Sequence, residues 1–105
     1  MFTLLGNGDG SFRSGVGYVV SGADAAVAIA DFSADGKPDV AVASFSTVAI
    51  LVGNGDGTLQ PSIDYAVGSD PRWMATADFN LDGKPDLVTA NRGSDDVSVL
   101  INTTR

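Results

Sequence analysis

The chain has 105 residues and a formal net charge of −7, with 13 acidic residues against 6 basic ones. It has no Cys, which excludes disulfides, and no His, which removes the commonest general base and the commonest transition-metal ligand. The few, scattered basic residues argue against a nucleic-acid partner. The sequence has no continuous apolar run of about 18 residues, so no membrane span is predicted.

The predicted elements are short strands joined by tight turns. Every acidic residue is Asp, a residue that favours turns over helices, and the Val- and Ala-rich runs favour strands. Residues 1–6 lack the basic segment of a signal peptide, so the chain is expected to be either cytosolic or a piece of a secreted protein without its leader. In chain order, strands are predicted at residues 2–5, 15–20, 26–30, 40–43, 48–52, 62–67, 73–77, 87–90 and 97–101.

The sequence repeats itself after 47 residues. Gly-Asn-Gly-Asp-Gly stands at residues 6–10 and again at 53–57, and the offset grows by two only near the end, where 97–100 correspond to 48–51. Four strands in a unit of this length are typical of a β-propeller blade. The prediction is an all-β module spanning residues 1–105, with a partial blade hairpin (1–25), a complete blade (26–67) and a second partial blade (68–105).

The chemistry lies in nine residues between the first two strands of each unit. They read Asp-Phe-Ser-Ala-Asp-Gly-Lys-Pro-Asp at 31–39 and Asp-Phe-Asn-Leu-Asp-Gly-Lys-Pro-Asp at 78–86. Oxygen-bearing side chains at positions 1, 3, 5 and 9, with Gly at position 6, follow the spacing by which a tight loop surrounds Ca²⁺. The alternative is an Asx-rich turn without metal. An EF-hand is excluded, because position 12 is Val42 or Thr89 instead of Glu.

The acidic loops and the Gly-Asn-Gly-Asp-Gly turns together resemble the FG-GAP (VCBS) repeat of integrin α-chain propellers. The resemblance covers essentially the whole chain and implies four-stranded propeller blades, Ca²⁺ in each loop and an extracellular or secreted location. Ser33 departs from the Asp or Asn that is usual there, which predicts a weaker first site. The implied Ca²⁺ ligands are Asp31, Ser33, Asp35, the Lys37 carbonyl and Asp39, and in the second loop Asp78, Asn80, Asp82, the Lys84 carbonyl and Asp86.

The predicted function is a calcium-binding propeller module with a structural or adhesive role, which binds a protein or another ligand. The alternative is a lectin, because some propellers built from similar repeats bind glycans between blades. Trp73 is expected to pack between blades and not to stack on a sugar. No enzyme is predicted, because the chain has no His, no Cys and no Ser in a nucleophile elbow.

The order of the strands also predicts a homo-oligomer. The chain opens and ends on a third strand, so the N-terminal hairpin is expected to complete the C-terminal blade of a neighbouring copy in a head-to-tail ring. Two repeats per chain give even totals, and a trimer with six blades is favoured over a tetramer with eight. Residues 2–5 and 97–101 would then compete for one position, so one of them should be displaced.

Overall fold

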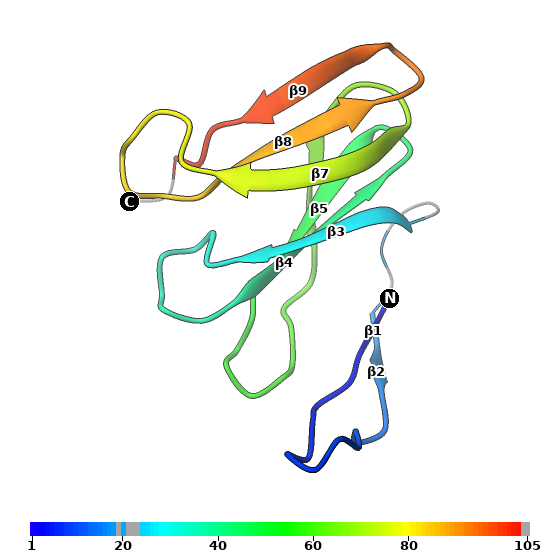
Figure 1. Cartoon of the computed structure of the whole chain (residues 1–105), viewed down its shortest axis with the longest axis vertical. Helices are drawn as coiled ribbons and strands as arrows, with labels where there is room; N and C mark the ends of the chain where they lie inside the picture. Colours follow the sequence, from blue (N-terminus) through cyan, green and yellow to red (C-terminus); the bar gives the residue numbers. More distant parts are fainter. Residues whose placement is uncertain (19, 21–23, 104–105) are drawn as a thin grey trace.

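A computed structural model describes residues 1–18, 20 and 24–103. All strands within these ranges are antiparallel and lie in three sheets (Figure 1). The same ranges contain no helix, and therefore no helical segment that could cross a membrane. The sheets are β1–β2 (Phe2–Thr3, Val16–Gly17), β3–β4–β5–β6 (Asp24–Ala30, Asp39–Ser44, Thr47–Leu51, Ile63–Ala66) and β7–β8–β9 (Pro71–Ala77, Asp86–Asn91, Asp96–Leu100).

The predicted all-β class and the antiparallel arrangement are confirmed, and most predicted strands lie within one or two residues of the observed ones. The first hairpin is shorter than predicted, since β1 and β2 have two residues each. An isolated two-stranded ribbon is marginal in water, because neither strand gains a second partner. Part of the predicted strand over residues 15–20 lies outside the described residues.

The duplication is visible in the strand registers. Thr3 pairs with Val16 just as Ile50 pairs with Ile63, and both members of the second pair are shifted by 47 residues. The two-residue offset near the end is also confirmed, because Val40 faces Leu51 whereas Leu87, 47 residues after Val40, faces Leu100. The extra residues lie in the turn between β8 and β9, which is longer than the turn between β4 and β5.

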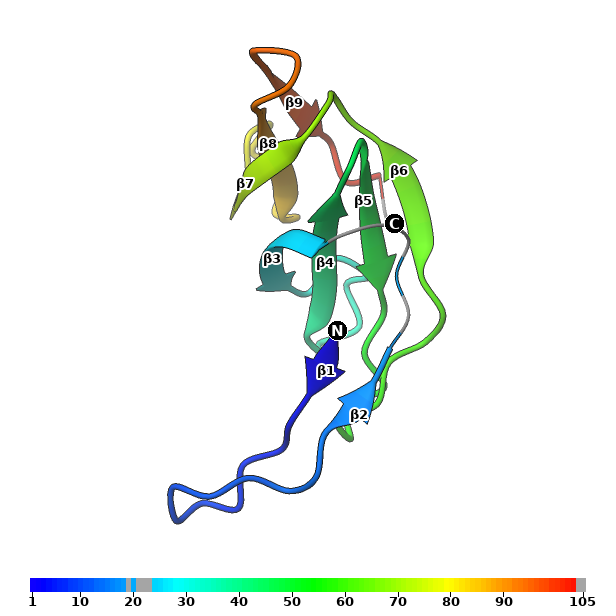
Figure 2. The same cartoon turned by 90° about the vertical axis from the view of Figure 1, so that its right-hand side faces the viewer.

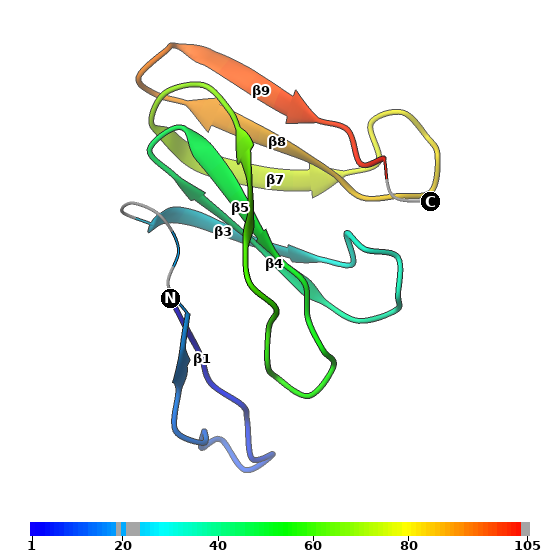
Figure 3. The same cartoon turned by 180° about the vertical axis from the view of Figure 1, so that it is seen from behind.

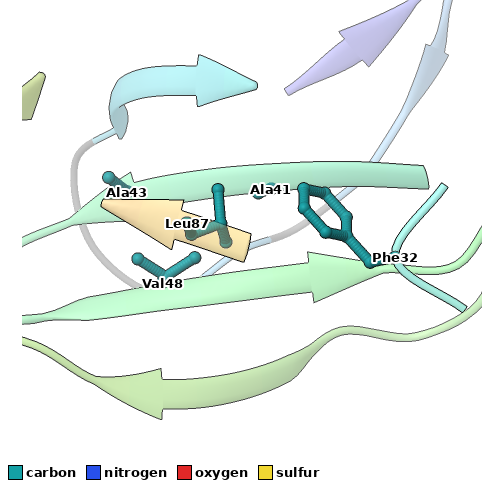
Figure 4. Packing of buried hydrophobic residues seen from close by; sticks show 5 residues of the cluster. All are labelled: Phe32, Ala41, Ala43, Val48 and Leu87. Atoms are coloured by element: carbon teal, nitrogen blue, oxygen red, sulfur yellow. The ribbon is translucent and has the colours of Figure 1, made fainter. Parts of the chain in front are cut away.

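The four-stranded sheet forms the centre of the molecule, with the hairpin at one end of the long axis and β7–β9 at the other (Figures 1 and 2). One of its faces packs against β7–β9, where Leu87 lies against Ala41, Ala43, Val48 and Phe32 (Figure 4). Small Ala side chains let the two sheets approach closely. The three sheets follow one another along the molecule and do not close into a ring within the single chain (Figure 3).

The opposite face of the central sheet packs against the N-terminal segment. Val42, Ala49 and Leu51 are buried there under Met1 and Tyr18. The Tyr18 hydroxyl accepts a hydrogen bond from the backbone N–H of Leu59 at 2.9 Å, which fixes the hairpin against the turn after β5. The central sheet therefore packs on both faces, but the N-terminal segment leaves Val27 and Ile29 on β3 exposed.

The sheet β7–β9 is covered on one face only. Trp73, Val97 and Val99 project from its other face, and the side chain of Trp73 is 73% exposed. The expectation that Trp73 packs between sheets is therefore wrong for the single chain. The physical reason is that none of the described residues packs over this face.

Candidate metal centres

Each acidic loop connects the first two strands of a sheet, from β3 to β4 and from β7 to β8. Both loops emerge at the same end of their sheets, on the left of Figure 1. Gly36 and Gly83 have φ values of 81° and 83°, so the residue at position 6 makes the sharp turn that the spacing predicted. Ala34 and Leu81 also have positive φ values, a strain that the sequence pattern did not predict.

The loops bring the predicted carboxylates together. Asp31, Asp35 and Asp39 each offer an oxygen atom, and these atoms lie within 4.8 Å of one another. Asp78, Asp82 and Asp86 form an equivalent triad. Two oxygens on opposite sides of one Ca²⁺ lie up to about 5 Å apart, because each Ca–O distance is about 2.3–2.6 Å. Each triad therefore fits around a single metal ion such as Ca²⁺.

Backbone N–H groups hold the first carboxylate of each loop in place. Asp31 accepts hydrogen bonds from the N–H groups of Gly36 at 2.8 Å and Asp35 at 3.2 Å, and Asp78 accepts from Gly83 at 2.7 Å. The bond from Gly36 is the main reason that the pKa of Asp31 lies below its ordinary value. The loop thus stabilises the charged form of the carboxyl group, which is the form that binds metal.

The third carboxylate of each triad is buried at the start of the second strand. In the first loop, Asp39 accepts the N–H of Ser33 at 2.9 Å on one oxygen and that of Gly53 at 2.8 Å on the other. An ionised carboxylate has about four lone-pair sites, so each oxygen keeps one for a metal ion. A side chain at Gly53 would meet the Pro38 carbonyl at 2.0 Å, so this approach requires glycine.

Asn102, after β9, contacts the second loop in the same way that Gly53 contacts the first. It also connects the two loops. Its backbone N–H donates to Asp86 at 2.8 Å, and its side-chain amide donates to the carbonyls of Phe32 at 2.8 Å and Pro85 at 3.1 Å. Sequence reasoning missed both Asn102 and Gly53. The signal was the two-residue offset that aligns the segment after β9 with the segment after β5.

The remaining predicted ligands lie in the loops beside the triads. The Ser33 hydroxyl donates to Asp31 at 3.4 Å, and the Asn80 amide donates to Asp82 at 3.3 Å. The backbone N–H of Lys84 donates to Asp82 at 3.0 Å, as that of Lys37 does to Asp35 at 2.9 Å, and the Lys84 bond is the main reason that the pKa of Asp82 is lowered. Metal ligation by Ser33, Asn80 and the two lysine carbonyls stays a prediction.

The geometry also bears on the alternatives. Val42 and Thr89 lie inside β4 and β8, and the described chain has no helix, so the exclusion of an EF-hand is confirmed. The hydrogen bonds from backbone N–H groups to Asp are those of an Asx-rich turn and do not by themselves require metal. The convergence of three carboxylates goes further, because like charges at this separation repel. The described ion pair, Arg72 with Asp70, lies outside both loops.

The fold and the two loops define an all-β repeat module with two candidate metal centres. The chain belongs to the FG-GAP-like repeat family, which matches residues 31–89, more than half of the sequence. The matched segment contains both acidic loops, so the predicted resemblance is confirmed. No curated protein and no solved structure matches the chain.

Proposed function

We propose that the chain is a calcium-binding β-propeller repeat module with a structural or adhesive role. The observation that carries the proposal is the pair of Asp triads, each within 4.8 Å and at equivalent places in two repeats. Asp side chains, with Ser, Asn and backbone carbonyls beside them, form an all-oxygen ligand set on a curved loop, which suits Ca²⁺. Transition metals are disfavoured because the chain has no His or Cys.

The stacking of the sheets supports the propeller part of the proposal. The central sheet has four strands in sequential order, and β7–β9 packs face to face against it through Leu87. Repetition of this step around an axis produces a propeller. In each blade the ion would join the loop after the innermost strand to Asp39 or Asp86 at the start of the next strand, which fixes the turn between them.

The family resemblance implies an extracellular or secreted location, and this location is part of the proposal. Extracellular calcium modules function with dissociation constants of about 10⁻⁴–10⁻³ M, so a partly exposed loop with three carboxylates is sufficient. We assign the chain to binding and structure, not to catalysis, because the residues that carry most enzymatic acid–base and nucleophilic chemistry are missing.

The test is the melting temperature with excess Ca²⁺ and with chelator. An ion that binds only the folded state at a hundredfold excess over Kd stabilises it by about 2.7 kcal/mol. We expect Ca²⁺ to raise the melting temperature of the wild type, and Asp35→Ala or Asp82→Ala to lose about half of that increase. Asp64→Ala, which removes the same charge from exposed β6, should keep all of it. A wild type that is insensitive to chelator contradicts the proposal.

A second candidate function is glycan binding, and the exposure of Trp73 favours it. Trp73 lines an open hollow with Arg72, Arg92, Asp95 and Asp96, so an aromatic face stands beside charged hydrogen-bonding groups. A glycan array with the wild type and Trp73→Ala tests this candidate. Binding that depends on Trp73 supports a lectin, whereas an array without binders leaves the structural role as the function.

A further inference from the structure

The described chain buries less of its surface than a compact monomer of its size. Its accessible surface is 6254 Å², whereas a folded monomer of 10.7 kDa exposes about 5,500 Å² by the usual scaling with mass. The excess includes apolar side chains at both ends of the stack of sheets. We call the uncovered side of β7–β9, with Trp73, Val97 and Val99, the open face.

We propose that a second copy of this chain covers the open face, with its β2 paired to β9 and its Phe12 in the hollow between β6 and β9. The proposal rests on the arrangement of the sheets as successive blades, but it does not depend on the metal ion. Contacts within the chain provide the templates for the contacts between copies.

The contact between Tyr18 and Leu59 is the template for the docked hairpin. Tyr18 lies on the central sheet and its hydroxyl accepts the N–H of Leu59, while Leu59 packs beside it. Tyr65 is the equivalent of Tyr18 after 47 residues, but the described residues after β9 include no counterpart of Leu59. Tyr65 instead lines a hollow of about 210 Å³ with Ile63, Leu100 and Ile101.

Phe12 of a second copy is the proposed occupant of this hollow. Phe12 is the equivalent of Leu59 in the N-terminal hairpin, and it forms the same bridge to Gly6 that Leu59 forms to Gly53. Its side chain is 64% exposed, because the hairpin lacks the inner strands of a complete sheet. Phe12 from a second copy would fill the apolar hollow, and its N–H would reach the hydroxyl of Tyr65.

β9 has an edge that can pair with a strand of a second copy. Among the described strands β9 pairs with β8 alone, whereas its equivalent β5 pairs with both β4 and β6. Ile50 pairs with Ile63 in the central sheet. Val99 is the equivalent of Ile50 in β9, and Val16 is the equivalent of Ile63 in β2, so Val99 of one copy would face Val16 of the next. An unpaired edge of this kind accepts a strand from another chain.

The pairing requires an exchange of strands. In the single chain β1 occupies the edge of β2 that β9 would use, through Thr3 opposite Val16. Only two residues of β1 pair there, and Phe2 is largely exposed, whereas β9 is held along five residues by β8. We therefore expect β9 of one copy to displace β1 of the next.

The same docking covers the open face. Trp73 and its neighbours on β7 would meet Val27 and Ile29 of the second copy, which are exposed on β3 beside its hairpin. The contact joins two different surfaces, so it repeats head to tail, and we expect the repeated rotation to close into a ring. A ring of three copies has six sheets and a ring of four has eight, as the sequence predicted.

Engineered cysteines test the pairing directly, because the chain has no Cys of its own. Directly opposed residues on paired strands have Cβ atoms about 4.5–5.5 Å apart, near the separation that a disulfide spans. Oxidised Val16→Cys/Val99→Cys should give covalent species that end at three or four times 10.7 kDa on a non-reducing gel. The control pair Ile50→Cys/Ile63→Cys should close within one chain and remain at 10.7 kDa.

Mass in solution tests the docking without cysteines. Phe12→Asp should raise the dissociation constant of the oligomer at least tenfold, whereas Phe45→Asp, at an equally exposed Phe in the β4–β5 turn, should leave it unchanged. A wild type that has the mass of a monomer, or an oligomer that does not cross-link through Val16 and Val99, overturns the proposal. The measurements are made with Ca²⁺ and with chelator, so failure of the metal assignment appears separately as an unchanged melting temperature.

Discussion

The two acidic loops have nearly the same internal geometry but very different surroundings. The hydrogen bond from the glycine N–H to the first Asp measures 2.8 Å in one loop and 2.7 Å in the other. The hydrogen bond from the Lys N–H to the Asp at position 5 measures 2.9 and 3.0 Å. Phe32, at position 2 of the first loop, is 8% exposed under Leu87, whereas Phe79 at the same position is 48% exposed. Loop geometry is therefore local, and its support comes from the next sheet.

The largest effect that would sharpen this comparison is the removal of each Phe. Phe32→Ala should lower the free energy of unfolding by about 3–5 kcal/mol, because it leaves a cavity between two sheets. Phe79→Ala should lower it by about 1 kcal/mol or less, because that side chain has little packing to lose. Urea unfolding of both variants, in chelator and in protein dilute enough to be monomeric, measures the difference. Equal losses would show that the neighbouring sheet does not support the first loop.

A smaller effect is expected from the link between the loops. Asn102→Ala removes two side-chain hydrogen bonds to the carbonyls of Phe32 and Pro85. We expect a loss of about 1–2 kcal/mol, because two backbone carbonyls each lose one hydrogen-bond donor. Asn7→Ala removes a side-chain hydrogen bond to Ser11 in an exposed turn and should change stability by less than about 0.5 kcal/mol. Thermal unfolding measures the loss of stability in both variants. Equal losses would argue against the link between the loops.

The difference at position 3 can be removed by one substitution. Ser33→Asn makes the first loop match the second and should lower its dissociation constant for Ca²⁺ by about threefold to tenfold, or about 0.7–1.4 kcal/mol. Calcium titration in an Asp82→Ala background isolates the first site, and Asn80→Ser in an Asp35→Ala background is the reciprocal change. If Ser33→Asn weakens binding, the side chain at position 3 is not a ligand.

The smallest expected effect concerns pH and distinguishes β9 from β5. Asp96 starts β9 where Thr47 starts β5, and bonds from the Ser94 hydroxyl and the Asn91 amide lower the pKa of Asp96. A lowered folded-state pKa stabilises the fold above the unfolded value of about 3.9, and this stabilisation is lost as the pH falls through the folded value. Between pH 7 and pH 3, Asp96→Thr should therefore lose less stability than the wild type in chelator. A loss as large as that of the wild type would contradict the assignment.

The features that the sequence predicted well are those set by nearby residues. The nine-residue spacing predicted the turn at Gly36 and Gly83 and the approach of three Asp in each loop, because a tight loop leaves its side chains few directions. The periodic Val and Ala residues predicted the strands, and the predicted duplication reappears in their registers.

The features that it missed depend on residues far apart in the chain. Asn102 reaches Phe32 across 70 positions, and no local pattern marks that contact. Trp73 is exposed because no described sheet packs over its face of β7–β9, although its own strand is apolar enough to be buried. The short β1 and β2 have the same cause, since a strand pattern without inner partners pairs only briefly.

The most direct test of the central claim is the number of calcium ions that one chain binds. Isothermal titration of the wild type with Ca²⁺ should give two ions per chain, Asp35→Ala and Asp82→Ala should give one each, and the double variant should give none. Asp64→Ala, which removes the same charge outside both loops, should still bind two. A wild type that binds no Ca²⁺, or a double variant that still binds two ions, would contradict the assignment of the Asp triads as metal centres.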